Sequence, residues 1–125
     1  MPHLTLEYSA NLARLDPSAT LAALNRALAA SGQFDDLDIK SRATSFADFA
    51  VGSRAPGHAF VHAKLAILAG RSEQTRRELS EQVLCALKAV VPAHAGLALQ
   101  LCVEIVEIER ASYAKALVPA AVSIA

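Results

Sequence analysis

The first residue with chemical potential is Pro2, which directly follows Met1 and opens the alternating run HLTLEY over residues 3–8. A proline at the first position of a strand does no harm, because its missing N–H is not needed there. A second interpretation requires that Met1 be removed, so that Pro2 carries a free secondary amine. A terminal amine has a pKa near neutral pH and can therefore act as an acid–base group. The dipeptide alone leaves both interpretations open.

Basic side chains at further positions could bind carboxylates. Lys40 and Arg42 alternate within one polar segment, so a strand would place both on the same face. Arg71 follows Gly70 just before an expected helix, and Arg54 lies in a turn. Nearby cations favour the neutral form of an amine and lower its pKa, so a base and carboxylate-binding cations suit one pocket. Each cation also has a plainer interpretation, as a solvated charge on a strand or loop.

Metal and cofactor sites are not indicated by the sequence. The 4 histidines lack metal-ligand spacing, and no zinc pattern involves the 2 cysteines. The segment AGRS, at residues 69–72, is too short for a phosphate-binding glycine loop. His62 shares a strand face with Lys64, and we interpret it as a structural histidine rather than a catalytic base. We therefore expect chemistry that uses no metal and no cofactor.

The elements that must position these residues follow the order strand, helix, strand, repeated once. Asp16 and Pro17 begin the first helix as cap and first helical residue, and Gly32 stops it. Ser72 caps the second helix, and Pro92 ends it. Strands are expected at residues 3–8, 39–50, 58–68 and 97–108.

Each half of the chain is thus a βαβ unit, whose crossover places two parallel strands beneath one helix. Two such units side by side predict a two-layer α+β fold, with both helices on one face of a four-stranded sheet. The other face is expected to be bare and half-apolar, which favours oligomerisation. No linker or low-complexity segment interrupts the pattern, so residues 1–125 are expected to form a single domain.

The amino-acid composition indicates which kinds of molecule the protein can bind. Lys and Arg total 12 and Asp and Glu total 12, and this balance argues against nucleic-acid binding. The hydrophobic fraction of 54% exceeds the usual ~45–50%, which suggests burial between subunits. Cys85 and Cys102 are expected to be buried thiols in a reducing cytoplasm. No apolar run approaches the ~18 residues of a membrane span, and no signal peptide is visible. We therefore expect a cytoplasmic protein without a membrane partner.

The sequence resembles the tautomerase superfamily, and within it the 5-carboxymethyl-2-hydroxymuconate Δ-isomerases of homoprotocatechuate breakdown. The resemblance covers nearly the whole chain, through MPHLTLEYSANL, DIKSR, FVH, AGRS and VEIVEI. It implies a tautomerase-like fold, a homotrimer with sites at subunit boundaries, and an amino-terminal catalytic proline, which is Pro2. It also implies that Arg71, Lys40 and Arg42 bind the carboxylates of a small substrate. The implied activity is cofactor-free ketonisation of a carboxylated dienol.

Two features leave alternatives open. Lys40 stands where the resembling family has an arginine, and an ammonium is a point charge where a guanidinium is a bidentate fork. The tail after residue 111 also departs from the pattern expected of the family. A tautomerase for a different 2-oxo acid is therefore one alternative. A non-catalytic module of ferredoxin-like type, for small-molecule binding or assembly, is the other, because a fold does not decide a function.

Overall fold

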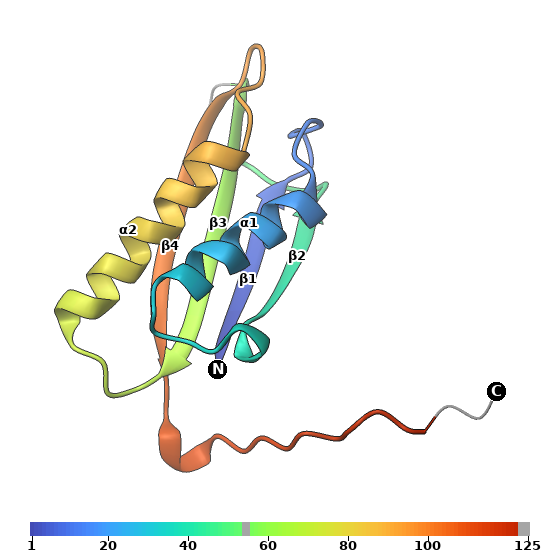
Figure 1. Ribbon diagram of the computed structural model, residues 1–125. Helices are drawn as coiled ribbons and strands as arrows, with labels where there is room; N and C mark the ends of the chain where they lie inside the picture. The colour runs from blue at the N-terminus through green and yellow to red at the C-terminus, as the bar shows by residue number, and fades with distance from the viewer. Residues whose placement is uncertain (54–55, 123–125) are drawn as a thin grey trace.

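The protein is described by a computed structural model that covers residues 1–53 and 56–122 (Figure 1). The chain-order elements are β1 (Pro2–Ser9), α1 (Pro17–Ala30), η1 (Asp36–Asp38), β2 (Lys40–Phe46), β3 (His58–Leu68), α2 (Glu73–Val90), β4 (Ala98–Ile108) and η2 (Arg110–Ser112). The helices begin where their caps predict. Asp16 accepts a hydrogen bond from the Ala19 N–H, and Ser72 accepts one from the Thr75 N–H at 3.1 Å.

The four strands form one sheet in the order β2-β1-β3-β4. The outer pairs, β1 with β2 and β3 with β4, are parallel, as βαβ crossovers require. The central pair, β1 with β3, is antiparallel. Both helices cover the same face of the sheet (Figure 1). This arrangement confirms the expected α+β fold of two βαβ units.

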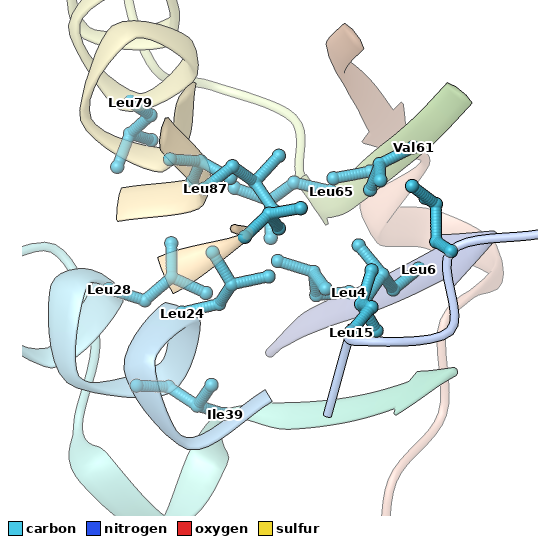
Figure 2. Close-up of a cluster of buried hydrophobic side chains, with 14 of the residues drawn as sticks. Leu4, Leu6, Leu15, Leu24, Leu28, Ile39, Val61, Leu65, Leu79 and Leu87 are labelled. Carbon is cyan, nitrogen blue, oxygen red and sulfur yellow. The ribbon is translucent and has the colours of Figure 1, made fainter. Parts of the chain in front are cut away.

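The core lies between this face and the two helices. Figure 2 shows leucines from α1 and α2 pointing at residues of the two central strands. The α1 residue Leu24 and the α2 residue Leu87 are both fully buried. They pack in one cluster with buried strand residues, among them Leu4, Leu6, Val61 and Leu65. The apolar stripes expected from the helical period therefore meet the alternating residues of the strands.

Three of the four strands differ from the sequence prediction in their bounds, and β1 is longer by one residue at each end. The polar strand ends at Phe46 rather than at residue 50, and the last strand begins at Ala98 rather than at residue 97. The carbonyl of Phe46 accepts a hydrogen bond from the Ala10 N–H at 2.9 Å, where the chain has already left β1. Once β1 ends there, residues 47–50 have no strand to pair with. The sequence pattern typical of a strand therefore continues past Phe46, beyond the last residue of β1 with which β2 can pair.

The prediction of buried thiols is wrong for the isolated chain. Cys85 and Cys102 are both exposed and both free. Cys85 lies on α2 away from its buried residues, which are Leu79, Val83 and Leu87. Cys102 lies on the sheet face that no helix covers, directly across from His62. Leu101 and Val103 pack against the core, so the alternation of the strand places Cys102 between them on the opposite face.

The bare sheet face has a polar centre and apolar ends. Cross-strand pairs place Thr5 beside Lys64 and Glu7 beside His62. The imidazole Nε2 of His62 lies 3.0 Å from a carboxylate oxygen of Glu104 on β4. Apolar side chains of this face lie toward the two strand ends, among them Phe46, Phe60, Ala66 and Val106.

The tail after η2 has no regular structure and leaves the body of the molecule. Figure 1 shows it running below the N-terminus and beyond β2. The Lys115 ammonium donates to the Asp38 carboxylate at 2.6 Å, which attaches the tail next to β2. Beyond this point Leu117 and Val118 are 88% and 85% exposed.

None of the described helices is long and apolar enough to cross a membrane.

Replacing Leu24 with alanine tests the helix–sheet core. Leu24→Ala should lower the free energy of unfolding by about 2–5 kcal/mol, because a fully buried leucine leaves a cavity. Leu37→Ala is the matched control, because Leu37 is 92% exposed, and its effect should stay within about 0.5 kcal/mol. Urea denaturation at one protein concentration measures both. Equal losses in the two variants would contradict this description of the core.

Candidate active site

The topology gathers the candidate residues at one edge of the sheet, which we call the N-terminal edge. Because β1 is antiparallel to β3, the beginning of β1 lies beside the end of β3, with Pro2 opposite Ile67. Because the outer pairs are parallel, β2 begins and β4 ends at the same edge. Lys40 at the start of β2 and Arg71 just after β3 are therefore brought toward the amino terminus.

Arg71 is held rigidly by neutral acceptors. The preceding Gly70 has φ +124°, in a region that favours glycine, and it turns the chain out of β3. The Arg71 guanidinium donates to the side-chain oxygen of Gln33 at 3.1 Å and to its carbonyl at 3.0 Å. It also lies 4.7 Å from the centroid of the Phe34 ring. Within the described residues no carboxylate pairs with Arg71, so its charge stays available to an anion.

A pocket of about 280 Å³ lies beside this arginine. Its charged lining residues are Arg71, Arg110, Asp35 and Asp38, and Met1 lines it as well. The remaining lining residues are Gly32, Gln33, Phe34 and Leu68. The Arg110 guanidinium donates to the carbonyl of Ala69 in the turn after β3, and so it too is held by a neutral acceptor. The pocket thus has two fixed guanidinium groups and the start of the chain in its wall.

The amine of Met1 lies among cations. It donates to the Asp38 carbonyl oxygen at 3.2 Å, and the Lys40 ammonium donates to the same oxygen at 2.7 Å. Partial burial lowers the pKa of this amine below its usual value, and the charges of Lys40, Lys115 and Arg71 lower it further. The Asp38 carboxylate, 3.9 Å away, opposes the shift. An amine at this end of the chain is therefore biased toward its neutral form.

Pro2 is the first residue of β1 and is fully buried. With Met1 attached, its nitrogen is a tertiary amide that neither donates a proton nor acts as a base. The position fits the strand-start interpretation, in which no N–H is needed. It also places the Pro2 nitrogen next to Met1, a residue of the pocket wall.

Arg42 does not line this pocket, and neither do Lys40 and Pro2. Arg42 lies on the bare face of the sheet, across from Thr5, and is exposed. Its guanidinium contacts the His3 imidazole at 2.9 Å. Arg42 therefore approaches the N-terminal edge from the face opposite to the helices. Arg54 lies outside the described residues.

Sequence reasoning missed Arg110, Lys115 and Asp38. The Lys115 ammonium donates to the Asp38 carboxylate, and this bond lowers the pKa of Asp38 and raises the pKa of Lys115. A signal for Arg110 was present, because parallel strands end at the same edge. Arg110 follows β4 as Arg71 follows β3, so both are expected at that edge once the pairing is known. Lys115 and Asp38 had no such signal, because neither lies in a periodic segment.

No group of three His, Cys, Asp or Glu side chains in the described ranges is arranged to hold a metal ion. Glu104 and Glu107 have separate partners: Glu104 contacts His62, and Glu107 lies 3.2 Å from Arg76. The charged groups at the N-terminal edge are instead suited to binding an anion and to shifting the pKa of an amine.

Comparisons with known proteins show the family to which the chain belongs. The sequence profile of the 5-carboxymethyl-2-hydroxymuconate isomerase family matches residues 2–118. The crystal structure of a 5-carboxymethyl-2-hydroxymuconate isomerase from Deinococcus radiodurans R1 is 36% identical, with a TM-score of 0.84 over 92% of this chain and 88% of that one. A 5-carboxymethyl-2-hydroxymuconate delta-isomerase is 25% identical, with a TM-score of 0.77 over 95% and 89% of the two chains. No curated protein sequence matches this chain.

More distant structures share the fold alone. A fused 4-OT symmetric trimer is 18% identical, with a TM-score of 0.72 over 91% of each chain.

The family match covers nearly all of the chain and removes the non-catalytic module from consideration. The protein belongs to the 5-carboxymethyl-2-hydroxymuconate isomerase family and is an isomerase of the tautomerase type.

Proposed function

We propose that the protein ketonises a carboxylated dienol such as 5-carboxymethyl-2-hydroxymuconate, with the amine of Pro2 as its acid–base group once Met1 has been removed. The observation that carries the proposal is the setting of the amino terminus, where partial burial, with help from Lys40, Lys115 and Arg71, lowers the pKa of an amine against the opposing charge of Asp38. The names of the similar structures support the substrate class. The proposed setting is the cytoplasmic breakdown of aromatic compounds, in the homoprotocatechuate pathway that the sequence resemblance implies.

The reaction moves one proton from the dienol hydroxyl to a distant carbon, without any change in oxidation state overall. The O–H bond breaks, a C–H bond forms, and the double bonds shift along the chain between them. The group that carries the proton must be neutral beforehand and must hold the proton during the step. A free Pro2 amine suits this task, because its ring and the strand behind it limit its directions.

The carboxylates of the substrate are bound by Arg71, with Lys40 and Arg42 as further contacts. Arg71 has no carboxylate partner among the described residues, and its fork matches a carboxylate in a bidentate manner. Lys40 offers a point charge 2.7 Å from the Asp38 carbonyl, beside the amine. The lysine favours tautomerisation of another 2-oxo acid as a second candidate, because it changes the geometry at one carboxylate.

The active form is proposed to be a homotrimer with its sites at the subunit boundaries. Three features of the single chain support assembly: the bare sheet face, the tail that leaves the body, and the exposed Leu117, Val118 and Val122. Surfaces of this kind are often interfaces. The fused 4-OT structures are described as symmetric trimers, and they share this fold.

Blocking the amine tests the proposed base. Protein with a free Pro2 should catalyse ketonisation, and Met1-retained protein should not, because an amide nitrogen has no basic lone pair. Pro2→Ala should keep partial activity, because alanine still offers an amine that is less constrained. Ultraviolet assays on samples verified by mass measure the three rates. Equal rates for the free and blocked forms would place the base elsewhere.

The pH profile of the free form adds a second check. Activity should rise as the Pro2 ammonium loses its proton. Its midpoint should lie below that of an ordinary terminal amine, since burial and the cations of the N-terminal edge favour the neutral form.

Removing the Arg71 charge tests substrate binding. Arg71→Ala should lower kcat/KM for a carboxylated dienol roughly ten- to a hundredfold, the usual effect of losing a charge-assisted contact. Arg77→Ala is the matched control, because Arg77 is 59% exposed on α2 and pairs only with Glu73 among the described residues. Steady-state kinetics on folded variants measures both. An unchanged kcat/KM in Arg71→Ala would make Arg71 a structural loop residue.

Sedimentation velocity tests the assembly. The full chain should sediment as a trimer at micromolar concentration. A stable monomer with full activity would exclude both the trimer and any site shared between subunits.

A further inference from the structure

His3 lies between a candidate substrate-binding residue and the C-terminal tail. Its Nδ1 is 2.9 Å from the Arg42 guanidinium, and its Nε2 is 3.1 Å from the Tyr113 hydroxyl. The His3 and Tyr113 rings are 6.2 Å apart, centroid to centroid, and tilted by 56°. One imidazole thus connects β2, β1 and the tail at the N-terminal edge.

The direction of this hydrogen-bond chain follows from the chemistry of its ends. A guanidinium only donates, so the Arg42 N–H donates and Nδ1 of His3 accepts. A neutral imidazole that accepts at Nδ1 carries its proton on Nε2, and this N–H donates to the Tyr113 oxygen. The hydroxyl proton of Tyr113 is left to donate to a further acceptor. His3 can hold both neighbours only in this neutral form.

We propose that His3, as the Nε2–H tautomer, is a positioning residue that aims the Arg42 guanidinium at a substrate carboxylate and ties the tail to the same point through Tyr113. What Arg42 binds rests on the proposed function, whereas the tautomer and the contacts of His3 do not.

Arg42 needs such support because little else holds it. It is exposed on the bare face, and no carboxylate in the described part of the chain lies within ion-pair distance of it. A flexible arginine loses conformational entropy on binding a ligand, and a side chain held in advance loses less. The bond to His3 uses one of its five N–H groups and leaves the others for a carboxylate.

The surroundings of His3 favour the neutral form. Partial burial lowers the pKa of His3, and the charges of Arg42 and Lys40 on β2 lower it further. The other charged or titratable groups around it are the Met1 amine just before β1, Lys64 diagonally across on β3, Tyr113 and Lys115 on the tail, and Asp38 beside them.

Protonation of His3 should change KM, and the direction of that change distinguishes a positioning role from a purely electrostatic effect. A second ring proton removes the acceptor of Arg42, so KM for a carboxylated substrate should rise as pH falls through the His3 pKa. Charge alone would have the opposite effect, because an extra cation strengthens the binding of an anion.

The first experiment is independent of activity. Nitrogen-15 NMR of the imidazoles in the full chain should show His3 as the Nε2–H tautomer with a pKa below that of an ordinary histidine. Arg42→Met removes the donor and the charge, and it should raise the pKa of His3. A neutral His3 protonated on Nδ1, or a pKa that does not respond to Arg42→Met, would overturn the proposal.

The second experiment uses two variants of the full-length protein that each keep one of the two hydrogen bonds of His3. The amide oxygen of His3→Asn takes the place of Nδ1 and keeps the Arg42 bond, whereas the amide nitrogen of His3→Gln takes the place of Nε2 and keeps only the Tyr113 bond. His3→Asn should hold KM within about twofold and lose its acid-side rise, since it does not titrate. His3→Gln should raise KM about tenfold with little change in kcat.

His62→Asn is the matched control, because His62 lies on the same face but contacts Glu104. It should keep both the KM and the acid-side rise of the unmodified protein. Equal KM increases in His3→Asn and His3→Gln would overturn the positioning role. If the unmodified protein with a free Pro2 does not turn over a dienol, the proposed function fails, and NMR still decides the tautomer.

Discussion

The antiparallel pairing of β1 with β3 is the constraint on which the candidate site depends. It places the first residues of the chain beside the end of β3, with Pro2 opposite Ile67. The parallel outer pairs then add the start of β2 and the end of β4 to the same edge. A parallel central pair would have put the amine and Arg71 at opposite ends of strands that are 8 and 11 residues long.

Three cations at this edge, Arg71, Arg110 and Lys40, have no carboxylate partner among the described residues. Arg71 and Arg110 are held through carbonyls, an amide and an aromatic ring, so that each keeps its charge while its side chain is fixed. Lys40 is likewise held by the Asp38 carbonyl rather than by a carboxylate. Neutral acceptors thus fix these side chains without neutralising them. Their positive charge adds to the effect of burial on the pKa of a nearby amine, and it attracts a carboxylate.

The two faces of the sheet carry different kinds of residues. The covered face holds the leucine core and the helices, while the bare face carries Arg42, His3 and the polar centre around His62. The tail joins the second group at Tyr113 and Lys115 before it leaves the body of the molecule. Groups from both faces meet at the N-terminal edge, where Lys40 is the link between the amine and β2.

Local signals in the sequence were sufficient for the elements. The caps at Asp16 and Ser72 and the alternation around Val61 act over a few residues, and the two helices and four strands appear where these signals predict. Pro2 as the first strand residue was equally local. The family resemblance, rather than spacing, selected Arg71, Lys40 and Arg42 together.

Only the tertiary structure decided which of these residues meet. The orientation of β1 relative to β3 arises from a long connection, so no turn motif encodes it, and both the pocket and the role of Arg110 follow from it. Burial of Cys85 and Cys102 was wrongly predicted, since neither lies on the side of its element that packs against the core. The sequence by itself determined the helices and strands and the place of Pro2 at the start of β1. The separation of Arg42 from Arg71, and the bond of Arg42 to His3, came from strand register, which is a long-range property of the sheet.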